Sequence, residues 1–200
     1  MKLGILGTGH VATVLGVAWS KNHEVILGSR DPAAKSADFG VRSLDDTVAG
    51  ADVVVNAILG SVAVETISSI AAGAFGGKTL VDVANATTPE NGLVYPNSSL
   101  AEELQAARPD ARVVKTLNCA AITTGANPSV IGPSSVFLSG DDSAAKQQTA
   151  GLLRDLGWSE DDIVDLGGIE TARGPEHYLL LFFGLAGLLG TEAFNIRVIR

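Results

Sequence analysis

A glycine-rich hexapeptide at the seventh residue constrains the fold of this chain more than any other feature. Gly7-Thr8-Gly9-His10-Val11-Ala12 directly follows the predicted strand Lys2–Leu6 and opens a segment with helical spacing. A G-x-G-x-x-A pattern between a strand and a helix is typical of a dinucleotide-binding βαβ unit. Gly7 permits a tight turn, Gly9 lets a pyrophosphate approach the backbone, and Ala12 allows close helix packing. We therefore expect the helix N-terminus to bind a dinucleotide. The residues expected to contact it are Gly7, Thr8, Gly9, His10 and Val11.

The rest of the chain alternates predicted strands with helical segments. The predicted strands are Lys2–Leu6, Glu24–Leu27, Asp52–Ile58, Thr79–Val83, Arg112–Leu117, Ser135–Leu138 and Ile163–Asp165. Some of them, such as the one containing Val53-Val54-Val55, are apolar on both faces, which is typical of parallel strands covered by helices on both sides. Ser99 with Glu102, and Asp141-Asp142, are helix-start signals. The sequence predicts an α/β fold with a Rossmann-type doubly wound, mostly parallel sheet.

The length of 200 residues fits one domain with a short appendage. We predict a dinucleotide-binding domain over residues 1–168 and a C-terminal helical segment over residues 169–200. That segment contains Leu179-Leu180-Leu181-Phe182-Phe183, which lies on a helix that is apolar nearly all round. Such a helix should complete the active site or pack against a second copy, so we expect a homodimer.

Composition excludes several other classes of protein. The chain has 14 Lys and Arg against 22 Asp and Glu, a net charge of −8, which argues against nucleic-acid or membrane-surface partners. Its longest apolar run, residues 178–190, is shorter than the ~20 residues that span a bilayer. The single Cys fits a reducing compartment, and the His and Cys residues show no metal-ligand spacing. We expect a soluble cytoplasmic protein without a metal site.

A basic residue at the end of the second predicted strand indicates which dinucleotide is bound. Folds that prefer NAD place an acidic side chain there, about 20 residues after the glycines, to bind the ribose 2′-hydroxyl. This chain has Gly28-Ser29-Arg30 instead. A guanidinium and a hydroxyl favour a 2′-phosphate, which a carboxylate would repel. The sequence therefore predicts NADP, although Arg30 could instead pair with Asp31 at the surface.

Three candidate binding loops follow later strands at the edge where open α/β sheets bind ligands, and the first and last of them are small and apolar. These candidate binding residues are Ala57, Ile58 and Leu59, then Asn85, then Asn118, Cys119, Ala120 and Ile122. A stacked nicotinamide and a second flat ring need such walls, although ordinary loop packing would leave the same pattern.

Few titratable side chains fall near these positions. Cys119 is expected to be a buried structural thiol, and Lys115, inside a predicted strand, is expected to point to the surface. His10 could contact a phosphate or the nicotinamide, or simply begin the helix. We therefore expect no catalytic acid or base among the side chains.

Four stretches of the chain resemble the NADPH-dependent coenzyme F420 reductases. They are Gly7-Thr8-Gly9, residues 23–30, residues 113–118 and Ser139-Gly140-Asp141-Asp142, and the similar order continues to Ile196-Arg197. The resemblance implies a compact Rossmann protein, usually a dimer, that passes a hydride between NADP and the deazaflavin F420. It also implies that Thr8, Ser29 and Arg30 hold the 2′-phosphate.

The same resemblance assigns the remaining positions. Ala57 and Ile58 would line the nicotinamide, and residues 118–122 the deazaflavin. A further cation of the family usually stands at the position of Ala34, and here Lys35 follows one step later. His10 replaces a commoner Asn or Asp. Arg173 and Glu176 match a recurring pair before the last helix.

Two other functions fit the residues. One is an NADPH-dependent reductase of a flavin, a ferric chelate or a small imine or carbonyl. The other is a non-catalytic NADP-binding redox sensor, although the small apolar residues at 57–58 and 120–121 favour an open stacking site. A β-hydroxyacid dehydrogenase is disfavoured, because too few residues follow the last predicted strand to build its helical domain.

Overall fold

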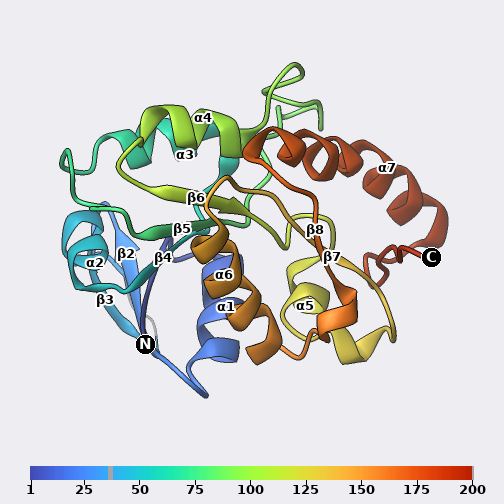
Figure 1. The fold of residues 1–200 in the computed structure, drawn as a ribbon, viewed down its shortest axis with the longest axis horizontal. Helices are drawn as coiled ribbons and strands as arrows, with labels where there is room; N and C mark the ends of the chain where they lie inside the picture. Colours follow the sequence, from blue (N-terminus) through green and yellow to red (C-terminus); the bar gives the residue numbers. More distant parts are fainter. Residues whose placement is uncertain (36–37, 200) are drawn as a thin grey trace.

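The computed structural model describes residues 1–35 and 38–199. Six parallel strands form one sheet in the order β3-β2-β1-β4-β5-β6 (Figure 1). Their bounds are β1 Lys2–Leu6, β2 Glu24–Ser29, β3 Gly40–Ser43, β4 Val53–Asn56, β5 Thr79–Asp82 and β6 Arg112–Lys115. The strand order reverses direction between β1 and β4, as in Rossmann folds. The predicted doubly wound fold is confirmed.

The strands differ from the prediction in several ways. β2 continues to Ser29, two residues past its predicted end at Leu27, and β5 ends at Asp82, one residue before its predicted end. The short edge strand β3 was not predicted, because its residues, Gly40-Val41-Arg42-Ser43, form no apolar run. The strands β4 and β6 end at Asn56 and Lys115, each two residues before the predicted end, where the chain turns into loops. β7 (Val136–Leu138) and β8 (Ile163–Asp165) pair with each other in a separate two-stranded parallel sheet.

Helices cover both faces of the main sheet (Figure 1). Their bounds are α1 His10–Trp19, α2 Leu44–Gly50, α3 Gly60–Ser68, α4 Leu100–Ala107, α5 Ile122–Gly125, α6 Ser143–Asp155 and α7 Arg173–Leu189. Short 3₁₀ helices lie at Pro128–Val130, Glu160–Asp162 and Ile169–Ala172. Val53 and Val55 pack in one core with α1 and α6, whereas Val54 packs in a second core with α2, α3 and α4. This alternation explains why the strands are apolar on both faces.

The helices differ in how they begin. Side chains of Ser43, Ser99 and Asp142 accept hydrogen bonds from the first turns of α2, α4 and α6, which confirms the start signals at Ser99 and Asp142. By contrast, α1 and α3 begin after Gly9 and Leu59, with no side-chain cap from the described part of the chain. The first backbone N–H groups of α1 and α3 are therefore left without a side-chain partner.

The helix α7 extends beyond the sheet (red in Figure 1). Its buried residues are Pro175, Glu176, Leu179 and Phe182, and Phe182 stacks on Phe194 at a ring distance of 4.9 Å. The chain then returns to β7, where the carbonyl of Ile196 accepts a hydrogen bond from Ser135 N at 2.8 Å. None of the helices described, α7 included, has the length and apolar character needed to cross a membrane.

Candidate functional site

Two adjoining pockets lie at the carboxyl ends of the parallel strands. The β5 pocket, of about 390 Å³, is lined by Gly9, His10, Val11, Ala57, Ile58, Leu59, Gly60, Val83, Ala84, Asn85, Leu117, Asn118, Ala120 and Ile122. The β2 pocket, of about 530 Å³, is lined by Gly7, Thr8, Gly9, Gly28, Ser29, Arg30, Asp31, Ala34, Lys35, Leu44, Ala57, Ile58, Leu59, Val62 and Thr66. The pockets share Gly9 and residues 57–59. Every predicted site residue except Cys119 lines at least one of them.

Gly7 and Gly9 of the hexapeptide have different structural roles. Gly7 has φ +120°, and a Cβ there would lie 2.7 Å from the carbonyl oxygen of Ala57, so packing requires glycine. A Cβ on Gly9 would meet no heavy atom within 4 Å. Gly9 therefore leaves open space beside the uncapped N-terminus of α1. That space, with its free N–H groups and helix dipole, fits an anionic pyrophosphate.

The far end of the β2 pocket carries positive charge. Arg30 and Lys35 are both exposed there, beside the buried Ser29. Asp31 is held in its own turn: its carboxylate accepts a hydrogen bond from Ala34 N at 3.3 Å, and its N–H donates to Ser29 Oγ. Within residues 1–35 and 38–199, Arg30 forms no ion pair with Asp31 or any other carboxylate. This arrangement fits a phosphate better than a ribose hydroxyl.

The β5 pocket has mostly apolar walls. Its single titratable lining residue is His10, and the side chain of Leu59, 69% exposed, stands where the two pockets meet. Asn85 and Asn118 bind each other across the rim: Asn85 Nδ2 donates to the carbonyl of Asn118 at 2.8 Å, and Asn118 Nδ2 donates to Asn85 Oδ1 at 3.0 Å. The pocket therefore suits a flat ring with one polar edge.

Backbone strain marks the loop after β6. Leu117 has φ +59°, a left-handed conformation that costs a branched side chain about 1–3 kcal/mol. Leu117 lines the β5 pocket and immediately precedes Asn118. This conformation sharply turns the chain at the end of β6, and the Asn85–Asn118 pair then holds the loop in place.

Cys119 lies outside both pockets. It lines a cavity of about 10 Å³ with Trp158 and Asn195, and its Sγ lies 3.6 Å from the carbonyl oxygen of Pro175. Burial raises the pKa of the Cys119 thiol to about 12, so the thiol is protonated at neutral pH. This geometry agrees with the prediction of a buried structural thiol.

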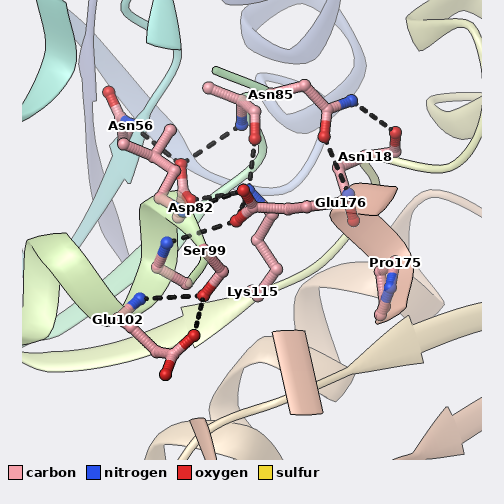
Figure 2. Close-up of polar contacts among 12 residues, drawn as sticks. Asn56, Asp82, Asn85, Ser99, Glu102, Lys115, Asn118, Pro175 and Glu176 are labelled. Carbon is pink, nitrogen blue, oxygen red and sulfur yellow. Dashed lines mark hydrogen bonds and ion pairs between the residues drawn. The ribbon is translucent and has the colours of Figure 1, made fainter. Parts of the chain in front are cut away.

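Three buried charged residues lie behind the wall of the β5 pocket (Figure 2). Lys115 Nζ lies 2.8 Å from Asp82 Oδ2 and 2.9 Å from Glu176 Oε1. The expectation that Lys115 points to the surface is wrong: only 1% of its side chain is exposed. The two carboxylates compensate the loss of hydration of the ammonium. Burial alone lowers the pKa of Lys115, but the attraction of Asp82 and Glu176 outweighs it and leaves the pKa above its ordinary value.

Sequence reasoning missed this cluster, although a signal exists. Asn56, Asp82 and Lys115 each end a strand whose preceding residues are apolar, and they are in register across β4, β5 and β6. Such a polar row at the end of buried strands indicates mutual pairing. Arg173 and Glu176 lie in the first turn of α7 rather than before it, and Arg173 lowers the pKa of Glu102 chiefly through a hydrogen bond.

Comparisons with known proteins agree with this geometry. A sequence profile of the family described as NADP oxidoreductase, coenzyme F420-dependent, matches residues 2–86. A proposed F420-dependent NADP reductase from Arthrobacter sp. FB24 shares 38% sequence identity at a TM-score of 0.92, with 100% of both chains covered. A hypothetical protein from Sinorhizobium meliloti shares 26% identity at a TM-score of 0.67, over 84% of this chain and 86% of that one.

More distant structures share the fold alone. An imine reductase from Pseudomonas sp. has 17% identity at a TM-score of 0.67, over 94% of this chain and 62% of its own length. A reductive aminase from Aspergillus terreus, in complex with NADPH4 and two small molecules, has 22% identity at a TM-score of 0.69, with the same coverage.

Proposed function

This chain belongs to the family of coenzyme F420-dependent NADP oxidoreductases and is an NADP-dependent oxidoreductase, and we propose that it transfers a hydride between NADP(H) and the deazaflavin coenzyme F420. The observation that carries the proposal is the β5 pocket, an apolar cavity that adjoins a phosphate-compatible pocket at the same sheet edge. The full-length similarity to the Arthrobacter protein supports F420 as the second substrate.

The proposed binding follows the two pockets. The pyrophosphate of NADP would bind at the N-terminus of α1, against the backbone of Gly9, His10 and Val11. Thr8, Ser29, Arg30 and Lys35 would hold the 2′-phosphate in the β2 pocket. The side chains proposed to line the nicotinamide are Ala57, Ile58 and Leu59.

The deazaflavin would bind on the other side of the β5 pocket. There Ala120 and Ile122 supply the apolar wall, Asn85 and Asn118 the polar rim, and Cys119 anchors the loop from behind.

The proposed mechanism is one of positioning. The two bound rings supply the hydride chemistry, so the protein must hold them close together and exclude water. Small side chains at Ala57 and Ala120 leave room for stacked rings, and Ile58 and Ile122 keep the pocket apolar. His10 is the single titratable side chain in the wall of the β5 pocket. We propose that no side chain acts as a general acid or base.

We also propose that the protein is a homodimer that associates through α7. The exposed apolar side chains of this helix are Leu180, Leu181, Phe183, Leu188 and Leu189. Leu188 is 80% exposed, and the sequence has no charged residue between Tyr178 and Gly190. A contiguous apolar face of this kind on a small domain is typical of a subunit interface.

Mixing the protein with NADPH and oxidised F420 tests the proposed reaction. We expect the absorbance of the oxidised deazaflavin to disappear with the NADPH absorbance, in equal amounts. The same assay with a free flavin, a ferric chelate and a cyclic imine serves as the comparison. Faster reduction of one of these, or tight NADPH binding with no reduction of any acceptor, would contradict the proposal.

Replacing Arg30 with alanine tests the 2′-phosphate site. A lost charge-assisted contact should weaken NADPH binding about 10- to 100-fold and leave NADH binding nearly unchanged. Dissociation constants from fluorescence titration provide the measurement. Equal losses for both dinucleotides would show that Arg30 does not contact the 2′-phosphate.

Filling the β5 pocket should be more harmful than removing its titratable group. Ala120→Trp should abolish turnover while NADPH still binds, because the indole occupies the space of the second ring. His10→Asn should keep most of the turnover. Steady-state kinetics of both variants provide the measurement. A loss of about 1,000-fold in kcat for His10→Asn would contradict the positioning mechanism and require a proton-transfer role for His10.

Charges placed on α7 should separate the subunits. Light scattering on the wild-type protein at micromolar concentration should give twice the mass of one chain. The double variant Leu181→Glu, Leu188→Glu should give one chain mass, because a dimer would bury both carboxylates. Val17→Glu, at an exposed apolar position on α1, is the matched control and should remain dimeric. A monomeric wild type would refute the interface.

A further inference from the structure

The charged cluster of Asp82, Lys115 and Glu176 lies behind the β5 pocket without lining it. These side chains come from β5, β6 and the first turn of α7 (Figure 2). Their relative exposures are 0%, 1% and 5%. Burying three charged groups is costly, and an apolar core would fill the same space without that cost. The cluster therefore calls for an explanation other than stability.

Each charge in the cluster is compensated. Lys115 Nζ donates a hydrogen bond to Asp82 Oδ2 at 2.8 Å and forms an ion pair with Glu176 Oε1 at 2.9 Å. Two carboxylates and one ammonium leave the cluster with one excess negative charge. Backbone N–H groups at the start of α4 stabilise this charge by donating hydrogen bonds to Glu176. Leu100 N donates to Glu176 Oε2 at 2.8 Å, and Ala101 N donates to Glu176 Oε1 at 3.2 Å. The cluster thus fixes the relative position of β5, β6, α4 and α7.

The cluster also reaches the wall of the β5 pocket along two routes. Lys115 Nζ donates a hydrogen bond to the carbonyl oxygen of Ala84, and Ala84 N donates to Asp82 Oδ1 at 3.2 Å. Asn56 Nδ2 donates to the same Asp82 oxygen at 2.8 Å, and Asn56 Oδ1 accepts from Ile58 N at 3.1 Å. Both Ala84 and Ile58 line the pocket. Two segments of the wall are therefore held by hydrogen bonds from the cluster.

We propose that Asp82, Lys115 and Glu176 are positioning residues, which fix Ile58 and Ala84 and thereby set the place of the reacting ring in the β5 pocket. The proposal rests on the proposed function, in which that ring is the nicotinamide of NADP. Hydride transfer depends steeply on the distance between donor and acceptor, so a shift of the wall acts on kcat. Ile58 lines both pockets, but Ser29, Arg30 and Lys35 at the far end of the β2 pocket have no bond to the cluster among the described residues, so binding of the 2′-phosphate end should depend little on it.

Glu176→Gln is the principal test, because it keeps the shape of the side chain and removes the charge that holds Lys115. The matched control is Arg173→Gln, one turn earlier on α7, which breaks the exposed ion pair of Arg173 with Glu102 and leaves the cluster intact. Three quantities are compared with the wild type: kcat, the dissociation constant of 2′,5′-ADP, and the emission of bound NADPH, which reports on the surroundings of the nicotinamide.

We expect Glu176→Gln to lower kcat about 10- to 100-fold and to change the emission of bound NADPH. The affinity for 2′,5′-ADP should stay within about twofold of the wild-type value. Arg173→Gln should leave all three quantities within the same range. If Glu176→Gln fails to fold, Asn56→Ser cuts the link from Asp82 to Ile58 and should reproduce the same pattern.

Other results would overturn the inference. A loss of affinity for 2′,5′-ADP well beyond twofold would indicate a general structural role. Unchanged emission and kcat would show that the cluster does not position the ring. The emission measurement needs no second substrate, so the two proposals can fail separately. If the wild type does not reduce F420 but Glu176→Gln still alters the emission of bound NADPH, the F420 reaction is refuted and the positioning role stands.

Discussion

The ammonium of Lys115, enclosed between Asp82 and Glu176, joins parts of this fold that hydrophobic packing leaves separate. The two apolar cores lie on opposite faces of the sheet, and the buried apolar residues Leu179 and Phe182 of α7 belong to neither. Removing one partner of a buried ion pair costs about 3–5 kcal/mol, which is comparable to much of the stability of a small domain. This contact therefore helps to orient α7 relative to the sheet, together with the ion pair of Arg173 and Glu102.

Among the residues that the structure describes, the helices that begin at the two pockets lack the side-chain caps that other helices of the sheet carry. α2, α4 and α6 are capped by their own Ser or Asp side chains, and α4 receives Glu176 as well. α1 and α3 begin at the pockets with Gly9 and Leu59, which provide no side-chain cap. The first backbone N–H groups of α1 and α3 are therefore available to bind an anion at this edge of the sheet.

Much of this architecture could be predicted because its signals are local. The hexapeptide at Gly7, the apolar strands and the loop ends are short stretches of sequence. They were enough to predict the fold and part of the lining of both pockets. Lys115 was misjudged because its partners lie 33 and 61 residues away, and pairing over such separations leaves no local pattern. The strand β3 was missed for a related reason: β2, rather than any apolar run of its own, holds it in the sheet.

The position of Glu176 near the end of the chain has a consequence for synthesis on the ribosome. All six strands of the main sheet have been made once Lys115 is added, and Asp82 can then pair with it. The second carboxylate follows only after 61 further residues, together with the helix that carries it. The last residue that lines the β5 pocket is Ile122, so all of its lining is made before α7, whereas the carboxylate of Glu176 that pairs with Lys115 behind the wall arrives only with that helix.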